Sequence, residues 1–157
     1  MSVAQLYLPF APYLVVRDGD PLAGAIANRH YSRLERGNTD QLRFCRPGKR
    51  LILLQPEGSW LFVWVLQKFR RDGQVGAECV LFRNEAPNKF LSSEIVLLAE
   101  KVWNDLHGFC RKFTYVNPRL VRSKNPGCCF QKAGWTKSDR RSSRGLILLS
   151  KEVVANV

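Results

Sequence analysis

Two side chains in this sequence are candidates for a general base, His30 and Glu85. His30 stands in the polar segment Asn28-Arg-His-Tyr-Ser-Arg rather than in an apolar stretch, and the ordinary histidine pKa of roughly 6.5 suits a general base. Glu85 follows Asn84 after a β-rich segment and could be a base or an acceptor for an amine; the alternative is a loop carboxylate with no task. His107, next to a helix end, is expected to interact with the helix dipole.

Basic residues are concentrated in two stretches, residues 29–50 and 111–144, which hold seventeen of the 25 lysines and arginines. The first has Arg29, Arg33, Arg36, Arg43, Arg46, Lys49 and Arg50, and the second has Arg111, Lys112, Arg119, Arg122, Lys124, Lys132, Lys137, Arg140, Arg141 and Arg144. The formal net charge is +12, which predicts a polyanionic partner: nucleic acid first, then a phosphorylated cofactor, then a membrane surface. Arginine forks match phosphate oxygens, and Tyr31, Phe44 and Trp135 could stack on a base. A generally basic protein is the alternative.

Composition limits the class of protein. The chain has 157 residues, 45% of them hydrophobic and 24% charged, which fits one ordinary globular domain, residues 1–157. Its apolar runs are too short for a membrane span, and no basic leader precedes the apolar N-terminal residues. The five cysteines form no CxxC pair, and no His/Cys/Asp cluster has metal-ligand spacing. We expect reduced thiols, a cytoplasmic location, no metal, no membrane, and a monomer or small homo-oligomer.

The elements expected to position these residues alternate between strands and helices. A first strand over Leu6 to Arg17 precedes a helix capped by Asp20, with Pro21 in its first turn. A meander follows over residues 51–54, 60–66 and 77–83, and then a long helix capped by Ser92 and ended by Gly108. Residues 113–117 form a strand, 127–133 a short helix that Gly134 stops, and 145–150 the last strand. The fold class is therefore α+β, a mixed α and β fold with a central antiparallel meander.

The last part of this order resembles the C-terminal half of the GNAT acyltransferase fold. A strand, long helix, strand and short helix end in an aromatic-x-x-small-Gly-aromatic pattern, here Phe130-Gln-Lys-Ala-Gly-Trp. The resemblance implies a mostly antiparallel twisted sheet flanked by helices and an acetyl-CoA or other acyl-CoA donor. The implied coenzyme-binding residues lie at the strand ends, at the opening of the long helix and on the short helix: Phe82, Arg83, Asn84, Leu91, Ser92, Ser93, Asn117 and Phe130. Backbone amides and hydroxyls at a helix N-terminus suit a pyrophosphate, although plain helix capping explains both serines equally well.

Two features depart from the GNAT pattern. The usual glycine-rich stretch is missing before the long helix, and Gln74-Val-Gly-Ala stands one strand too early. Phe130 occupies the position of the tyrosine that protonates the departing thiolate in many GNAT enzymes. The candidates to replace that acid are Tyr31, Tyr115 and the thiols of Cys128 and Cys129. The alternative for Tyr115 is a sheet residue with its hydroxyl at the surface, and the alternative for the two cysteines is burial as small hydrophobic side chains.

A narrower resemblance is to phage Mom-type proteins, GNAT-related enzymes that modify adenine in viral DNA and so defeat host restriction. It is carried by short motifs: His30-Tyr31-Ser32, Arg83-Asn84-Glu85, Ser92-Ser93-Glu94, Thr114-Tyr115-Val116-Asn117 and Gly127-Cys128-Cys129-Phe130. The resemblance implies an acyltransferase that acts on an amine of a DNA base, with His30, Tyr31, Ser32, Glu85 and Tyr115 as catalytic candidates. A base in duplex DNA would have to be flipped out.

The DNA-binding candidates are Arg29, Arg33, Arg36, Arg43, Arg119, Arg122 and Lys124. Two alternatives to DNA modification stay open. One is a GNAT N-acetyltransferase for protein, tRNA or a small amine. The other is a DNA-binding protein on the same fold that has lost coenzyme affinity, which the missing glycines and Phe130 both favour.

Overall fold

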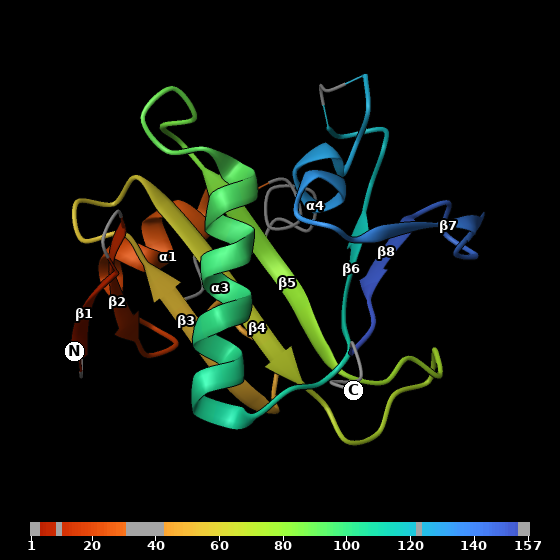
Figure 1. Ribbon diagram of the computed structural model, residues 1–157, viewed down its shortest axis with the longest axis horizontal. Helices are drawn as coiled ribbons and strands as arrows, with labels where there is room; N and C mark the ends of the chain where they lie inside the picture. Colours follow the sequence, from red (N-terminus) through yellow and green to blue (C-terminus); the bar gives the residue numbers. More distant parts are fainter. Residues whose placement is uncertain (1–3, 9–10, 31–42, 122–123, 154–157) are drawn as a thin grey trace. The chain divides into compact units, whose positions relative to one another are not determined.

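The computed structural model describes residues 4–8, 11–30, 43–121 and 124–153 of the chain. The fold is mixed α+β, with a mostly antiparallel sheet and helices (Figure 1). By its internal contacts the chain divides into two compact units. The first comprises residues 1–65 and 80–89, and the second comprises residues 66–79 and 90–157. A single domain over the whole chain stays a prediction.

The first unit contains the strands β1 (Ala4–Leu8), β2 (Ala11–Val16), β3 (Lys49–Leu54) and β4 (Trp60–Leu66), the end of β5 (Ala77–Asn84), and the helix α1 (Pro21–Asn28). Neighbouring strands follow the order β1-β2-β3-β4-β5. The β1–β2 and β2–β3 pairs are antiparallel, with Val16 opposite Ile52 in the second pair. This arrangement confirms the expected meander.

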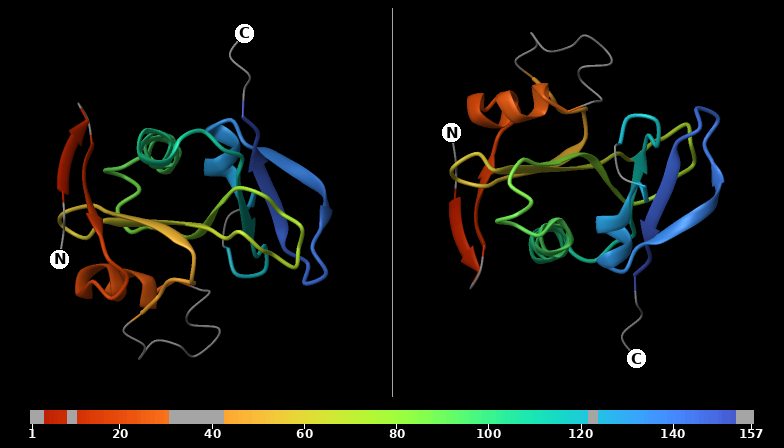
Figure 2. Two further views of the ribbon diagram at one scale, coloured as in Figure 1. Left: turned by 90° about the horizontal axis from the view of Figure 1, so that it is seen from below. Right: turned by 90° about the horizontal axis from the view of Figure 1, so that it is seen from above.

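A packed core fixes α1 on one face of these strands (Figure 2). Ile26 and Ala27 of α1 pack with Leu61 and Val63 of β4, and all four are fully buried. The helix starts as expected, because Asp20 Oδ1 accepts a 3.0 Å hydrogen bond from the backbone N–H of Ala23 and Pro21 occupies the first turn. Because the start of α1 is fixed, the positions of Arg29 and His30 at its other end are fixed as well.

The second unit contains the start of β5, the helices α3 (Ser92–His107) and α4 (Cys128–Lys132), and the strands β6 (Lys112–Val116), β7 (Thr136–Arg141) and β8 (Ile147–Lys151). The strand order is β5-β6-β8-β7. The β5–β6 pair is parallel, whereas β6–β8 and β8–β7 are antiparallel. α3 buries one apolar stripe that includes Ile95, Val102 and Trp103, as the spacing of its residues predicts.

Three sequence-based predictions of local structure were wrong. The single strand over Leu6 to Arg17 is two strands, β1 and β2, and Pro9 stands between them in the sequence, where a proline disfavours a continuous strand. The expected order of elements has no strand between the short helix and the last strand, but β7 forms there, almost fully exposed and at the end of the strand order. Ser92 does not cap α3, because Leu91 is the N-cap and no side chain caps that end.

Candidate functional site

Three residues of the first unit form an ion cluster around one carboxylate, here called the Glu85 cluster: Arg29, Arg83 and Glu85. Arg29 Nε and Nη2 each donate a 2.6 Å hydrogen bond to Glu85, and Arg83 Nε donates one of 2.7 Å. The hydrogen bonds from Arg29 and then Arg83 lower the pKa of Glu85 to about 2, against the opposing effect of burial. Glu85 is therefore ionised and occupied by two guanidinium groups at neutral pH.

His30 is a buried residue that interacts electrostatically with this cluster. It follows the C-cap of α1, and only 8% of the residue is exposed. Burial, and secondarily the positive charge of Arg83, lowers the pKa of His30 to about 4. The imidazole is therefore neutral at neutral pH and able to accept a proton, although burial makes it a weaker base than an ordinary histidine. Both oxygens of Glu85 already accept hydrogen bonds from arginines, and the choice between the two predicted bases stays a prediction.

The three residues at the end of β5 have different surroundings. The ring of Phe82 lies 5.0 Å from that of Phe62, centroid to centroid. Asn84 Oδ1 accepts a 3.0 Å hydrogen bond from the backbone N–H of Ala86, which turns the chain after the strand. The backbone N–H of Glu85 in turn donates to the carbonyl of Ser59 at 2.8 Å. Of the predicted coenzyme-binding residues Phe82, Arg83 and Asn84, two therefore make contacts that shape the end of β5. Arg83 pairs with Glu85, and Asn84 turns the chain.

The start of α3 is the predicted phosphate site of the second unit. Leu91 is the N-cap and is 54% exposed, Ser92 is half-buried and Ser93 is buried. Leu91 makes no side-chain capping hydrogen bond, and the amides of Glu94 and Ile95 donate to the Leu91 carbonyl, so an anion at this helix end would be bound by the amides of Ser92 and Ser93. The preceding segment, residues 85–91, contains no glycine. The structure therefore keeps the helix-end part of a phosphate site and lacks the glycine-rich part.

Tyr115 of β6 belongs to a polar network that the sequence did not predict. Its hydroxyl donates a 3.0 Å hydrogen bond to Asp72 Oδ2, and the other oxygen of Asp72 accepts a 2.9 Å bond from Arg70 Nε. Arg70 Nη1 also pairs at 2.5 Å with the buried carboxylate of Glu78. Burial and the hydrogen bond to Asp72 raise the pKa of Tyr115 to about 12. Tyr115 is thus a protonated hydroxyl whose hydrogen is already donated to a carboxylate.

The aromatic-x-x-small-Gly-aromatic pattern is a helix-ending device in this structure. After α4, the backbone N–H of Trp135 donates to the carbonyl of Phe130 and that of Gly134 donates to the carbonyl of Gln131, the two bonds of a Schellman motif. Gly134 has a φ of +95°, which a glycine adopts without strain. The rings of Phe130 and Trp135 lie 4.8 Å apart. Phe130 therefore packs as the hydrophobic contact of this motif.

The remaining candidates of the second unit are half-buried or exposed. Asn117 accepts a 3.1 Å hydrogen bond from the backbone N–H of Arg119. Burial raises the pKa of the Cys129 thiol to about 11, so Cys129 carries its proton at neutral pH. Arg119 and Lys124 are exposed. Tyr31, Ser32, Arg33, Arg36 and Arg122 lie outside the described residues, so their predicted roles stay predictions.

The structure thus brings Arg29, Arg83 and Glu85 together, with His30 in the same unit, while Tyr115 pairs with Asp72 in the other. A joint site stays a prediction. Among the residues that the structure describes, no group of three or more His, Cys, Asp or Glu side chains could hold a metal ion. Within the same ranges, no helix is both long and apolar enough to cross a membrane.

Comparisons with known proteins place the fold. No protein-family model matches the sequence, and no curated protein matches it either. A search of solved structures finds the crystal structure of the GNAT domain of PAT from S. lividans, with a TM-score of 0.59 and 15% sequence identity. The match covers 96% of this chain and 96% of that one. The chain therefore has the fold of a GNAT domain, and the phage Mom-type resemblance stays at the level of short motifs.

Proposed function

We propose that this protein is an acyl-CoA-dependent N-acyltransferase whose acceptor is an amine on a DNA base. The observation that carries the first half of the proposal is the GNAT-like fold over 96% of the chain. The second half rests on the net charge of +12 and on the short Mom-type motifs. The proposed location, in the cytoplasm, is that of a phage-encoded enzyme acting in its host.

In this proposal the donor substrate supplies an acyl group activated as a thioester, and the protein positions and deprotonates the acceptor. His30 accepts the proton of the amine, directly or through water, because it is neutral at working pH. A backbone amide after Phe82 donates a hydrogen bond to the thioester oxygen. Tyr115 stays the candidate that returns a proton to the thiolate, a role that requires its hydroxyl to give up the hydrogen bond to Asp72.

The uncapped start of α3 is the part of the chain that fits a pyrophosphate. In the proposal its amide groups and the hydroxyls of Ser92 and Ser93 bind the phosphates, which needs no glycine-rich loop. This use of the helix end leads to a direct test. Leu91→Asp would place a carboxylate at the N-cap, where it accepts the same amide hydrogens and stabilises the helix by about 1 kcal/mol.

Leu91→Asp is expected to raise the melting temperature and to weaken acetyl-CoA binding by about tenfold or more in calorimetric titration. Leu91→Asn is the matched control, because it occupies the amides without adding negative charge; a smaller loss of affinity separates charge repulsion from blocked donors. Unchanged acetyl-CoA affinity in both stabilised variants, or no acetyl-CoA binding by the unaltered protein, would contradict the proposal.

The acceptor is tested separately. Nucleosides from DNA of cells that express the protein are analysed by mass spectrometry, with His30→Ala as the control. A base heavier by one acyl group, absent with His30→Ala, is expected. Transfer in vitro is followed with labelled acetyl-CoA rather than a thiol reagent, because free and partly exposed cysteines such as Cys110 and Cys128 would react with that reagent. An unchanged nucleoside profile would remove the support for DNA modification while leaving acyl transfer to another amine.

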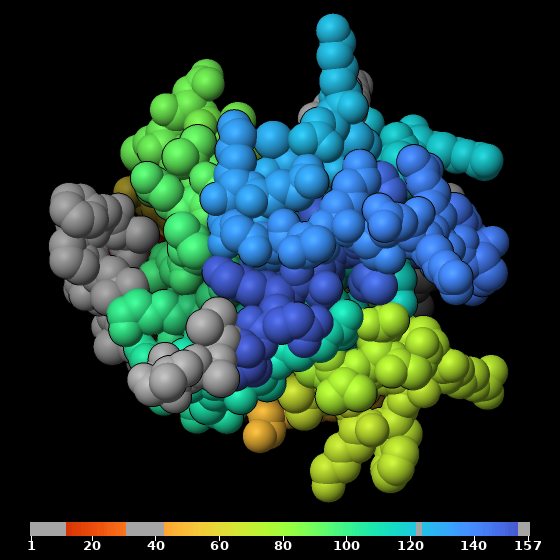
Figure 3. Space-filling model, turned by 45° about the vertical axis from the view of Figure 1, so that its right-hand side comes forward, coloured from red at the N-terminus to blue at the C-terminus, as the bar shows by residue number. Residues whose placement is uncertain are grey.

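Exposed cations on the β7–β8 hairpin suit contacts with the DNA backbone. Arg140 and Arg141 at the end of β7 and Arg144 in the turn are exposed, and this part of the chain lies on the surface shown in Figure 3. Each contact with a phosphate adds about one unit to the slope of binding against salt. Replacing Arg140 and Arg141 by glutamine is therefore expected to lower that slope.

One observation favours a non-catalytic DNA-binding protein as a second candidate. The aromatic ring of Phe130, which stands where many GNAT enzymes have their acid, is buried against Trp135 in a helix-ending motif. DNA binding without any acetyl-CoA affinity is the result expected of this second candidate.

A further inference from the structure

The β4–β5 loop, residues 67–76, exposes an aromatic ring between two cations. Phe69 is 92% exposed, the largest exposure among the large hydrophobic side chains that the structure describes. Lys68 precedes it and Arg71 follows two positions later, and both are exposed. The loop, in yellow-green, lies at the surface shown in Figure 3. A single exposed apolar side chain is ordinary by itself; what distinguishes Phe69 is how firmly its loop is held.

Arg70, the residue after Phe69, is buried and anchors the loop. Its side chain is only 9% exposed. Nε and Nη2 donate hydrogen bonds of 2.9 and 2.7 Å to the two oxygens of Asp72, and Nη1 donates to Gln67 at 3.1 Å and to the buried Glu78 at 2.5 Å. These four hydrogen bonds join the two arms of the loop at one guanidinium group.

The same anchor attaches the loop to β6. The guanidinium of Arg70 lies 4.8 Å from the centre of the ring of Phe113, which is fully buried in that strand. Asp72 also accepts 3.0 Å hydrogen bonds from the backbone N–H of Gln74 and from the hydroxyl of Tyr115. Because these contacts fix the loop before any ligand arrives, binding there loses little conformational entropy of the backbone.

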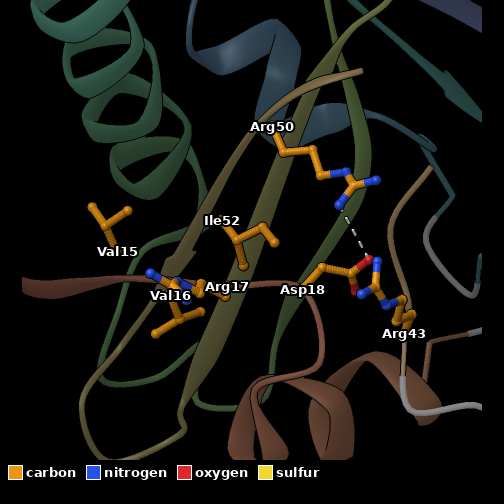
Figure 4. A pocket seen from close by; sticks show the side chains of 7 residues that line it. All are labelled: Val15, Val16, Arg17, Asp18, Arg43, Arg50 and Ile52. Atoms are coloured by element: carbon orange, nitrogen blue, oxygen red, sulfur yellow. Dashed lines mark ion pairs between the residues drawn. The ribbon is translucent and has the colours of Figure 1, made fainter. Parts of the chain in front are cut away.

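The first unit has a comparable carboxylate, Asp18, but the segment that it holds buries its aromatic ring. Asp18 Oδ1 accepts hydrogen bonds from the backbone N–H groups of Phe44 at 2.7 Å and Cys45 at 3.2 Å. Its Oδ2 lies 3.6 Å from Arg50 Nη1 (Figure 4). Phe44 is 9% exposed and belongs to the core. A segment held by an aspartate–arginine pair therefore does not expose its ring as a rule, and the outward position of Phe69 is a feature of the β4–β5 loop alone among these two.

The arrangement of ring and cations fits an unpaired strand of nucleic acid. Flat bases alternate with phosphates along such a strand; aromatic side chains stack on the bases, and lysine and arginine contact the phosphates. Since Arg70 is used inside the protein, Lys68 and Arg71 are the cations that face solvent on either side of Phe69. Val75 is the other exposed large hydrophobic residue of the loop, and two such side chains are too few for an apolar face that inserts between lipids.

We propose that the β4–β5 loop binds an unpaired base of a DNA strand. The ring of Phe69 stacks on the base, and Lys68 and Arg71 contact the phosphates on either side of it. The proposal rests on DNA as the acceptor in the proposed function, and it names the form in which the DNA is bound and the residues that bind it. It does not depend on acyl transfer.

The test is binding of a short fluorescent single-stranded oligonucleotide, and of an abasic strand of the same length, to the full-length protein. Phe69→Ala is expected to weaken oligonucleotide binding by about tenfold or more and to leave binding of the abasic strand unchanged, because only the first has bases to stack. Phe69→Leu keeps an apolar side chain without a flat ring and should lose nearly as much. Val75→Ala is the matched control, because it removes exposed apolar surface from the same loop, and it should bind like the unaltered protein.

Phe69→Trp reports the contact directly. The four native tryptophans are all buried, at 3% exposure or less, so the added indole is the one in solvent. It should keep the affinity for the oligonucleotide, and its emission should be quenched by that oligonucleotide but not by the abasic strand.

The cations are tested through the salt dependence of binding. Lys68→Gln and Arg71→Gln should each lower the slope of log affinity against log salt by about 0.7 for a single strand. Lys101→Gln removes the same charge from the exposed side of α3 and should leave the slope unchanged.

Strand binding that survives Phe69→Ala, or that is as tight in Phe69→Leu as in the unaltered protein, would overturn the proposal. An equal loss for the abasic strand would overturn it too, because the ring would then not contact a base. Vesicles of phosphatidylserine and phosphatidylcholine test the other class of partner. A blue shift of the Phe69→Trp emission on these vesicles, without quenching by the oligonucleotide, would replace the strand by a lipid surface.

These outcomes separate this proposal from the proposed function. If the unaltered protein binds DNA and the Phe69 variants bind it equally well, the loop assignment alone fails. If the unaltered protein binds neither strand, DNA as the acceptor fails together with the loop assignment. If strand binding depends on Phe69 but no acyl group is transferred, the enzymatic half of the proposed function alone fails.

Discussion

Arg29 holds the carboxylate of Glu85 at two points, through hydrogen bonds of 2.6 Å from both Nε and Nη2. The two residues are 56 positions apart in the sequence, so the contact joins the end of α1 to the segment that follows β5. It also places His30, the next residue after Arg29, at a fixed point of the fold. The pair therefore has a structural task that is independent of any proton transfer by Glu85.

The Arg29–Glu85 contact should be measurable as an interaction energy. In a double-mutant cycle of Arg29→Ala and Glu85→Ala, we expect a coupling of about 1 kcal/mol, at the upper end for exposed pairs because two hydrogen bonds form while half of the Arg29 side chain stays in solvent. The control is Lys101→Ala with Asp105→Ala, a single-point exposed pair on α3, which should give about 0.3–0.5 kcal/mol. Equal couplings in urea unfolding would refute a special role for the two-point contact.

The buried His30 should make folding stability depend on pH in a defined window. Its pKa is about 4 in the folded protein against roughly 6.5 in the unfolded chain. Protons therefore bind the unfolded chain first, and stability present above about pH 6.5 falls as the pH approaches 4, by up to about 3 kcal/mol.

Thermal unfolding between pH 7 and pH 4 measures this loss, and His30→Gln should flatten the curve there. His107→Gln, at the exposed histidine, is the control and should keep the slope. Glu85 contributes mainly below this window, because the stability that it adds is lost between its ordinary pKa of 4.5 and its folded pKa of about 2. A curve for His30→Gln that is as steep as that of the unaltered protein would show that His30 is not the group titrating.

Tyr115 should titrate about two pH units later than an ordinary tyrosine. Its pKa is raised to about 12 by burial and by the hydrogen bond to Asp72. The difference in ultraviolet absorbance between the unaltered protein and Tyr115→Phe is expected to report one phenol with that pKa. Asp72→Asn keeps an acceptor but removes the charge, so the midpoint should move toward 10; a midpoint already near 10 in the unaltered protein would exclude the Asp72 contact.

The features that could be predicted from sequence are those encoded by neighbouring residues. Asp20 and Pro21 specify the start of α1 within a few positions, and the apolar stripe of α3 is visible in its own sixteen residues. The pattern from Phe130 to Trp135 is likewise local, and its Schellman bonds explain it without any reference to catalysis.

Contacts between distant positions explain what could not be predicted. Asp72 and Tyr115 are 43 residues apart, and nothing in the segment around Arg70 distinguishes it from an ordinary charged loop. Asp18 likewise meets Phe44 across 26 residues. β7 is polar along its whole length, because its position at the end of the strand order requires little apolar surface.

Gly76 should be the least replaceable position in the segment that leads into β5. It has a φ of +118°, and a Cβ there would lie 1.9 Å from the carbonyl oxygen of Arg111. The same oxygen accepts the 2.9 Å hydrogen bond from the backbone N–H of Ala77 that continues the β5–β6 pairing, so the backbone cannot move away without breaking that bond. Gly76→Ala is expected to cost about 3 kcal/mol or more in the free energy of unfolding.

Gly73→Ala is the matched control, because its φ is also positive but nothing lies within 4 Å of the added Cβ, and it should cost only about 1 kcal/mol. Equal losses for the two variants in chemical unfolding would mean that backbone strain alone, and not the close approach to Arg111, requires glycine at position 76.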